Sequence, residues 1–408
     1  MSARLTDPAL PELGAAELRR FSRHLILPEF GLEAQRRLKA GSALLIGAGG
    51  LGSPTALYLA AAGVGRIGLV DPDVVEETNL QRQVAHGHST LGRPKTESAA
   101  ARMRDLNPDV VIERHDVFLN VGNALDLIAG YDVVIDGTDN FPTRYLVNDA
   151  CVKLGKPNVY GGVLRFDGQL SVFDARRGPC YRCLFPEPPP SELAPNCAEA
   201  GVLGVLPGVI GALQATEAIK LLTGIGQPMI GRMLVYDGLD LSFTSVDIAR
   251  APACPCCSGP RDEIELRETV MVCSAPQVGR SIEADALQAR LAGGEALTLV
   301  DVRNPSEWLG GTIPQALCLS KPALTEAVDL VLSGGLRPEN TLLDALPRDR
   351  EIVLYCQSGL RSAAVIRSLT AAGYDPSLLY NLEKGFAGWT GPRAEPGEAR
   401  PRQPAPAD

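Results

Sequence analysis

Four of the ten cysteines stand in two C-x-x-C pairs, a spacing that is typical of metal ligands. The first pair is Cys180 and Cys183, and the second is Cys254 and Cys257, with Cys256 between them. Ten cysteines in 408 residues are too few for a scaffold held by disulfides, so we expect metal ligands and reactive thiols. Four thiolates would give Zn²⁺ the tetrahedral coordination of a structural site. The alternative is that these cysteines are buried without a metal.

A further cysteine, Cys356, opens a loop that is suited to stabilising negative charge on sulfur. The segment Cys356-Gln-Ser-Gly-Leu-Arg361-Ser362 follows a predicted strand that ends at Tyr355 and precedes a predicted helix. A loop in this position points several backbone N–H groups inward, and the start of the helix adds positive potential. We therefore predict a reactive thiol at Cys356. The alternative is a buried cysteine at a strand end.

Cys197 lies at the end of a proline-rich segment. Residues 185–197 read FPEPPPSELAPNC, and their prolines exclude a helix or a central strand. We expect an exposed and mobile loop here. A thiol on such a loop is unlike a buried structural cysteine, so Cys197 is a second candidate for sulfur chemistry.

A glycine-rich motif near the start of the chain predicts a nucleotide-binding loop. Residues 47–52 read GAGGLG, which has the form G-x-G-x-x-G, and they lie between a predicted strand at 43–46 and a predicted helix at 53–62. Glycines in this place let backbone N–H groups approach a phosphate at the helix start. Asp71 ends the next predicted strand, where its carboxylate can bind ribose hydroxyls. The alternative is that the glycines serve tight packing alone.

Further polar residues follow the ends of neighbouring strands. Arg82 lies in the segment DPDVVEETNLQRQ that begins at Asp71, Lys95 stands at a predicted helix start, and Asp139 follows a strand at 132–136. Strand ends at one edge of a parallel sheet converge, so these side chains should meet over one crevice. Arg82 and Lys95 would offset phosphate charge and Asp139 would hold Mg²⁺, which suits a nucleoside triphosphate better than a hydride carrier.

Strand-like and helix-like segments alternate along most of the chain, and this pattern predicts an α/β fold with a mainly parallel sheet covered on both faces. Ser53 can cap the helix at 53–62, Pro54 fits its first turn, and Gly63 can end it. A second, smaller alternating unit begins near Ser281. The predicted strands lie at 43–46, 67–71, 110–114, 132–136, 158–161, 169–174, 297–301 and 352–355.

Composition limits the class of protein. The net charge is −9, with 45% hydrophobic and 21% charged residues, which is ordinary for a globular protein and argues against a surface built to bind nucleic acid. The amino-terminal segment lacks the apolar core of a signal peptide. The longest apolar stretch, 201–222, contains Gln214, Glu217 and Lys220, so we interpret it as a buried helix rather than a membrane span. We expect a cytoplasmic protein.

The motifs GAGGLGSP, DPDVVEETNLQRQ, GRPK and DGTDN together resemble those of the E1-like adenylyltransferases of the MoeB/ThiF group, over residues 15–260. This resemblance implies a Rossmann-like adenylation domain that joins ATP to the terminal glycine carboxylate of a ubiquitin-like sulfur carrier protein and releases pyrophosphate. Thr78 stands where serine is common in the group. The ATP-site residues that the resemblance implies are Gly50, Asp71, Thr78, Asn79, Leu80, Gln81, Arg82, Lys95, Asp139 and Asn140.

The same resemblance assigns further roles. It implies a structural Zn²⁺ on the four cysteines of the two C-x-x-C pairs, which leaves Cys256 as the spare thiol. The group inserts an arginine from the partner subunit, and Arg23 in the segment RFSRH is the matching residue, so we expect a homodimer. The alternative for Arg23 is an ordinary charge on a surface helix. In relatives with the pattern NCA-x-x-GVLG, the cysteine that matches Cys197 acts on the activated carrier.

The C-terminal part of the chain resembles a single rhodanese domain over residues 278–391. The resemblance rests on the Cys356 loop, on DVR at 301–303 with EW at 307–308, and on NLEKGFAGW at 381–389. It implies a smaller α/β domain in which Cys356 carries a persulfide. Four residues separate Cys356 from Arg361, and related phosphatases have one more, so the short loop favours sulfur over phosphate.

Together these observations predict an E1-like adenylyltransferase domain with zinc at 1–257, a linker at 258–277, a rhodanese domain at 278–391 and a disordered tail at 392–408. The predicted activity is adenylylation of the carrier's terminal glycine, followed by sulfur transfer from the persulfide to give a thiocarboxylate. Sulfur would come from a donor such as a cysteine desulfurase or thiosulfate. The residues leave the pathway open among molybdopterin, thiamine, tRNA thiolation and cysteine.

Other functions would share some of these residues. An NAD-dependent oxidoreductase would use the glycine loop and Asp71, but would not need Arg82, Lys95 and Asp139 over the phosphates. An E1-like enzyme that modifies tRNA directly is a closer alternative, and the paired cysteines, the rhodanese resemblance and the acidic balance weigh against it. A non-enzymatic scaffold would be indicated if alkylation of Cys356 changed nothing.

Overall fold

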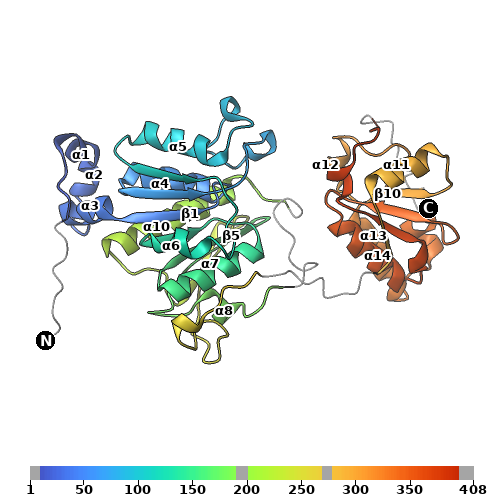
Figure 1. Ribbon diagram of the computed structural model, residues 1–408. Coiled ribbons are helices and arrows are strands. Elements are labelled where there is room, and N and C mark those ends of the chain that lie inside the picture. Colours follow the sequence, from blue (N-terminus) through green and yellow to red (C-terminus); the bar gives the residue numbers. More distant parts are fainter. Residues whose placement is uncertain (1–9, 190–200, 269–277, 395–408) are drawn as a thin grey trace. The chain divides into compact units, whose positions relative to one another are not determined.

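The computed structural model describes residues 10–189, 201–268 and 278–394 (Figure 1). The chain divides into two compact units, Met1–Met271 and Val272–Asp408, and each is described by itself. Both units are α/β structures with parallel-rich sheets, which confirms the predicted fold class.

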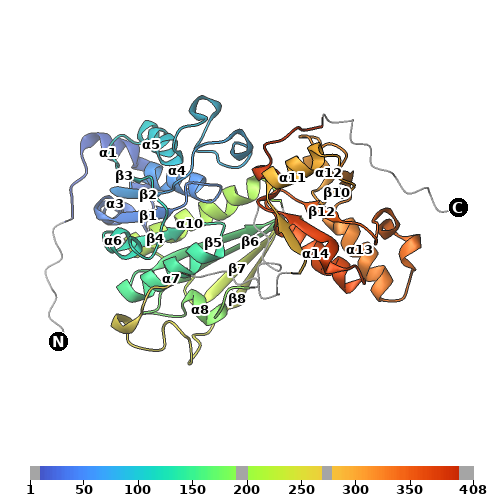
Figure 2. The ribbon, with the colours of Figure 1, turned by 45° about the vertical axis from the view of Figure 1, so that its right-hand side comes forward.

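The first unit is built on a sheet whose described strands have the order β3-β2-β1-β4-β5-β6-β7-β8. Strands β1 to β5 pair in parallel, whereas β6, β7 and β8 add to the sheet by antiparallel pairing (Figure 2). The antiparallel end is a finding of the structure, because short apolar runs look alike in the two kinds of ladder. The strands are β1 Ser42–Ile46, β2 Arg66–Val70, β3 Val111–His115, β4 Val133–Asp136, β5 Asn158–Leu164, β6 Asp167–Phe173, β7 Arg232–Asp237 and β8 Ser242–Asp247.

Helices cover both faces of this sheet because alternate residues of its central strands point to opposite sides. Along β1, Ala43 and Leu45 belong to the core that includes α3, α4, α5 and α10, whereas Leu44 and Ile46 belong to the core beneath α6 and α7. All four side chains are buried. The helices are α1 Ala15–Arg20, α2 Ser22–Leu25, α3 Gly31–Ala40, α4 Gly52–Ala62, α5 Lys95–Leu106, α6 Ala124–Ala129, α7 Phe141–Leu154, α8 Tyr181–Leu184 and α10 Val205–Thr223.

Within the described chain, α10 is the one helix long and apolar enough to cross a membrane. Its Gln214 side chain is fully buried and donates from Nε2 to the Asp136 carbonyl, at 2.7 Å, and to the Val159 carbonyl, at 3.1 Å. These bonds tie the helix to β4 and β5. The helix therefore packs on the sheet of this unit, as the prediction of a buried helix requires.

The second unit has a parallel sheet with the order β11-β10-β12-β13-β9. One core lies beneath α13 and α14, and the other includes α11, Phe386 and Trp389. The strands are β9 Arg280–Ile282, β10 Thr298–Asp301, β11 Leu317–Cys318, β12 Ile352–Tyr355 and β13 Leu379–Leu382, and the helices are α11 Ala284–Ala292, α12 Pro305–Trp308, α13 Lys321–Leu332 and α14 Leu360–Ala371.

The segments that the sequence assigns to a linker and a tail are described in part. Residues 258–268 lie on the first unit, where Lys153 Nζ donates to the Asp262 and Ile264 carbonyls at 2.9 and 2.7 Å. At the other end, Ala394 exchanges backbone hydrogen bonds with Thr312. Residues 269–277 and 395–408 lie outside the described chain.

Candidate functional site

The glycine motif forms a tight turn between β1 and α4. Gly47 has a φ of +95°, and a Cβ there would lie 2.9 Å from the Gly137 carbonyl oxygen. A Cβ on Gly52 would collide with the Gly47 carbonyl oxygen. Both positions therefore require glycine. The helix begins at Gly52 rather than Ser53, which makes no capping hydrogen bond, and it ends at Gly63 as predicted.

Asp71 holds this turn to the end of β2. Its Oδ2 accepts from the Ala48 N–H at 2.8 Å and its Oδ1 accepts from the Asp73 N–H at 2.9 Å. Burial raises the pKa of Asp71, while the nearby Lys95 charge opposes that rise. The carboxyl group therefore orders the glycine loop at the same edge where the sequence predicts ribose binding.

A pocket of about 750 Å³ opens at this edge of the sheet. It is lined by the glycine loop and by residues that follow β2, β4 and β5. Among the residues predicted to bind ATP, those that line the pocket are Gly50, Asp71, Arg82, Lys95, Asp139 and Asn140.

The other four predicted residues, Thr78, Asn79, Leu80 and Gln81, are not among the lining residues. They lie beside it on a short 3₁₀ turn, Glu77–Asn79, and just after it. The Thr78 carbonyl accepts from Arg82 Nη1 at 3.0 Å, and buried Asn79 Oδ1 accepts from the Glu76 N–H at 3.2 Å. In the structure Thr78 and Asn79 contact Arg82, and none of the four residues lines the pocket.

Lys95 is almost fully buried, with 7% of its surface exposed, and it lines the pocket. Its Nζ lies 2.8 Å from Oδ2 of Asp73, which also lines the pocket. Sequence analysis did not single out Asp73. Its position two residues after Asp71 in the polar segment was the available signal.

Asp139 and Asn140 stand at the start of α7. The Asn140 side chain accepts from the Thr143 N–H at 3.0 Å and so caps the helix. Asp139 is exposed beside it in the pocket wall, which suits a carboxylate that would hold Mg²⁺.

One wall of the pocket contains polar residues that sequence analysis missed. Arg144 Nη2 donates to the Thr138 carbonyl at 3.0 Å, and Tyr160 donates from its hydroxyl to Gln169 Oε1 at 3.2 Å. All four residues line the pocket. They come from α7, β5, β6 and the end of β4, so only the tertiary structure brings them together.

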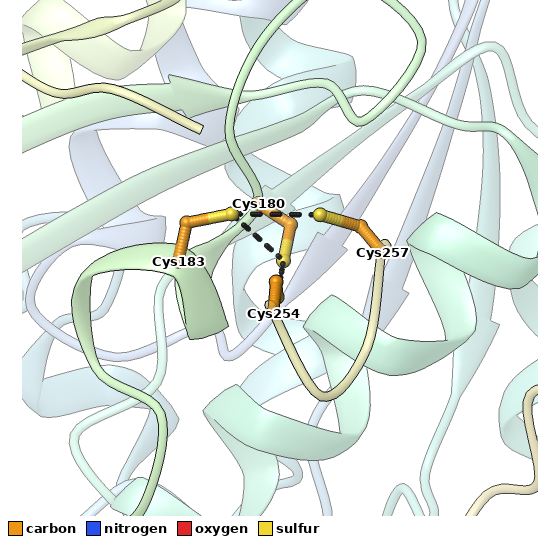
Figure 3. Close-up of side chains that lie close together, drawn as sticks. All are labelled: Cys180, Cys183, Cys254 and Cys257. Atoms are coloured by element: carbon orange, nitrogen blue, oxygen red, sulfur yellow. Dashed lines mark hydrogen bonds between the residues drawn. The ribbon is translucent and has the colours of Figure 1, made fainter. Parts of the chain in front are cut away.

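The four paired cysteines form one cluster, with their Sγ atoms within 4.8 Å of one another (Figure 3). Cys180 and Cys254 are 3.6 Å apart, and Cys183 and Cys257 are 3.4 Å apart, between sulfurs. Four thiolates at about 2.3 Å from Zn²⁺ in a tetrahedron lie about 3.8 Å from one another. The cluster is therefore compatible with zinc.

Cys256 lies outside this group of four, and its sulfur accepts from Asn148 Nδ2 at 3.7 Å. Asn148 Oδ1 also accepts from the Tyr181 N–H at 2.8 Å, and Arg182 forms two 2.8 Å hydrogen bonds with Asp149. These contacts fasten α8 to α7. Because Tyr181 lines the pocket, the cysteine cluster borders the pocket wall.

Arg23 lies on α2, where it is exposed, and it does not line the pocket of its own chain. The structure of one chain does not test the prediction that Arg23 enters the pocket of a partner subunit, so that role belongs to the proposed function below. Cys197 lies outside the described residues.

Cys356 lies at the end of β12 in the second unit and is fully buried. Its sulfur accepts from the Gly359 N–H at 3.1 Å and lies 3.6 Å from the Ser362 hydroxyl. Arg361 forms two hydrogen bonds with Glu307, of 2.6 and 2.8 Å. The loop thus places one backbone donor, the Gly359 N–H, on the sulfur, where the sequence predicts several.

A glycine-loop pocket on a Rossmann-like unit, followed by a parallel unit with a cysteine loop, is the organisation that the sequence predicts for an adenylation domain joined to a rhodanese domain. The model of the ThiF family matches residues 21–256, and that of the rhodanese-like domain matches residues 283–392. The chain belongs to the ThiF family and carries a C-terminal rhodanese domain.

One relative matches along most of the chain, and a second matches 62% of it. A probable adenylyltransferase/sulfurtransferase MoeZ of Mycobacterium tuberculosis is 44% identical over 94% of this chain and 95% of that protein. The sulfur carrier protein adenylyltransferase of Thermus thermophilus is 52% identical over 62% of this chain and 94% of that protein. The protein is accordingly an enzyme of the adenylyltransferase and sulfurtransferase class.

Among solved structures, the crystal structure of E. coli MccB with ATP has a similar fold. Its TM-score is 0.53 at 22% sequence identity, and the match covers 59% of this chain and 75% of that one. This likeness supports the E1 fold of the first unit.

Proposed function

We propose that the protein adenylylates the C-terminal glycine of a ubiquitin-like sulfur carrier protein and then converts the carboxylate to a thiocarboxylate with sulfur carried on Cys356. The observation that supports this most strongly is the pocket in which the glycine loop meets Arg82, Lys95 and Asp139. Relatives named as sulfur carrier protein adenylyltransferase and SAMP-activating enzyme E1 support the choice of substrate.

In the first step, a carboxylate oxygen of the carrier attacks the α-phosphorus of ATP, and pyrophosphate leaves with the bonding electrons. The carboxylate and the phosphates repel each other, so the site must supply positive charge. Backbone N–H groups of the glycine loop, Arg82 and Lys95 would bind the phosphates. Bound at Asp139, Mg²⁺ would neutralise phosphate charge. The product is an acyl-adenylate with no change in proton count.

In the second step, the terminal sulfur of a Cys356 persulfide attacks the acyl carbon, and AMP leaves. The carrier is then joined to Cys356 through an acyl disulfide. Attack by the Cys197 thiolate on the Cys356 sulfur would release the thiocarboxylate and leave a disulfide between the two cysteines, which a thiol reductant reopens. Sulfur would be replenished by a cysteine desulfurase or by thiosulfate.

The remaining expectations are part of the same proposal. The enzyme works as a homodimer in which Arg23 of one protomer reaches the pocket of the other. The cysteine cluster holds a structural Zn²⁺. The site of action is the cytoplasm.

The test is the exchange of pyrophosphate into ATP in the presence of a sulfur carrier protein ending in Gly-Gly. We expect Cys356→Ala to abolish thiocarboxylate formation and to leave this exchange at the wild-type rate. Loss of both activities in this variant would contradict the division of labour between the two units.

A further inference from the structure

Arg144 is a positively charged side chain in the pocket wall, and the proposed binding of ATP does not use it. It projects from the first turn of α7, one turn after the Asn140 cap. The guanidinium carbon lies 5.2 Å from the centre of the Tyr160 ring and 5.5 Å from that of Phe141. Two rings, the Thr138 carbonyl, which accepts from Nη2, and the Tyr160 hydroxyl, which lies 3.5 Å from Nη1, thus hold the side chain in place.

No carboxylate lies within ion-pair distance of this guanidinium among the described residues, and buried Nε has no hydrogen-bond partner there. Asp136 acts on it electrostatically, but its Oδ1 accepts from Thr138. The contrast with two neighbouring cations is clear. Lys95 pairs with Asp73, and Arg182 pairs with Asp149. Arg144 is therefore a partly buried cation that retains the capacity to bind an anion.

The topology separates Arg144 from the cations proposed to bind phosphate. Arg82 and Lys95 come from segments that follow β2, whereas Arg144 follows β4. In the sheet, β2 and β4 lie on either side of β1, whose end forms the glycine loop. A nucleotide on that loop would have Arg82 and Lys95 on one side and Arg144 on the other.

We propose that Arg144 binds the C-terminal carboxylate of the acyl substrate and holds it for attack on the α-phosphorus. The guanidinium can donate two hydrogen bonds to the two oxygens of a carboxylate. The proposal rests on the proposed function and names the residue that recognises its acyl half. On this proposal, Arg144 is the residue that distinguishes a free C-terminal carboxylate from an amide or an ester.

The test compares Arg144→Gln and Arg144→Lys with the wild-type full chain. The probe is a ubiquitin-fold sulfur carrier protein ending in Gly-Gly, in one form with its free carboxylate and in another with a C-terminal amide. Titration calorimetry gives the affinity for each form. We expect wild-type protein to prefer the carboxylate form and Arg144→Gln to lose that preference, through a roughly ten- to hundredfold weaker affinity for the carboxylate.

The matched control is Arg66→Gln. Arg66 also stacks on a tyrosine, 4.4 Å from the Tyr131 ring centre, but it pairs with Glu113 and lies outside the pocket. We expect this variant to keep the preference. Arg144→Lys should keep part of it, because its charge remains while the two-pronged hydrogen bonding is lost.

A second measurement shows whether a variant retains a folded pocket. We expect the KM for ATP in pyrophosphate exchange to change by no more than about twofold in Arg144→Gln. If Arg144→Gln kept its preference for the carboxylate form, or lost affinity for ATP as strongly as for the carboxylate, the role of Arg144 would be overturned and the proposed function would stand. Absence of exchange in the wild-type protein would instead overturn the proposed function.

Discussion

Glu307 and Arg361 form the ion pair that fastens the Cys356 loop to α12. Two hydrogen bonds join them, and the Glu307 carboxylate also accepts from the Asn304 N–H at 2.9 Å. Arg361 lies in the first turn of α14, directly after the Cys356 loop, so the pair holds the end at which the loop enters the helix. Removal of either charge should loosen the loop.

This ion pair predicts a pH-dependent stability. Burial alone would raise the pKa of Glu307, but the hydrogen bonds from Arg361 and Asn304 and the positive charges of Arg361 and Arg303 together outweigh it and lower that pKa below the ordinary value of 4.5. Its stabilising contribution is therefore present above pH 4.5 and is lost as the pH falls through the lowered value. We expect Glu307→Gln to unfold at lower urea concentration than wild type near neutral pH, and the difference to vanish in acid.

Fluorescence can follow this unfolding in the full chain. The chain has two tryptophans, Trp308 and Trp389, and both lie in the second unit. Glu339→Gln is the control, because the Glu339–Arg337 pair is 3.9 Å long and well exposed, and such pairs contribute little. An equal loss of stability in Glu307→Gln at every pH would contradict this account.

At the scale of single residues, the sequence did not predict which side chains of the site pair with one another. The types and positions of Lys95 and Asp139 indicated a phosphate and metal site, and both residues line the pocket. The pairing of Lys95 with Asp73, and the lack of a carboxylate partner for Arg144 within the described chain, depend on which segments meet in space. The spacing of residues within one strand–turn–helix segment does not show which other segments will contact it.

The glycine loop is the element on which the pocket depends most. Gly52→Ala places a Cβ against the Gly47 carbonyl oxygen, which belongs to the backbone and cannot move without opening the turn. We expect this variant to lose carrier-dependent pyrophosphate exchange by at least about a hundredfold, because displaced N–H groups no longer bind phosphate.

The control for this prediction is Gly87→Ala. Gly87 has extended backbone, with φ of −147°, and a Cβ there would meet no atom within 4 Å. Exchange should stay at the wild-type rate. Activity of Gly52→Ala near that of Gly87→Ala would show that the loop does not bind the nucleotide.

The cysteine cluster lies next to Tyr181 in the sequence and borders the pocket through that residue. Helix α8 contains Cys183 and also Tyr181, which lines the pocket, and Cys180 directly precedes the helix. We expect Cys254→Ser to lose bound zinc, as measured by atomic emission, and to lower both thermal stability and exchange activity. Cys256→Ser should retain its zinc, because Cys256 lies outside the group of four. Full zinc in the Cys254 variant would contradict the assignment of the ligands.

At the scale of elements, local signals predicted some boundaries and missed others. Gly63 ends α4 in the left-handed conformation that glycine favours, and α10 packs on the sheet through Gln214. Ser53 does not cap α4, because the tight turn already makes Gly52 helical. The antiparallel pairs β5–β6 and β7–β8 are hairpins of consecutive strands, whereas β6–β7 joins strands far apart in the sequence, which composition does not reveal.

At the scale of the molecule, the two units have separate cores and separate reactive groups. The pocket lies in the first unit and the Cys356 loop in the second. The two matches, at 21–256 and 283–392, correspond to this division. The proposed reaction gives each unit one chemical step, and its intermediate is the acyl-adenylate that the first unit makes and the second consumes.

The most direct test of this central claim is the intact mass of the carrier protein after reaction with ATP, Mg²⁺ and a persulfide donor. With wild-type enzyme, we predict a carrier heavier by the difference between one sulfur and one oxygen atom. With Cys356→Ala, we predict a carrier of unchanged or adenylylated mass and no thiocarboxylate. A thiocarboxylate formed equally well by the Cys356 variant, or none formed by wild type with any carrier ending in Gly-Gly, would contradict the account.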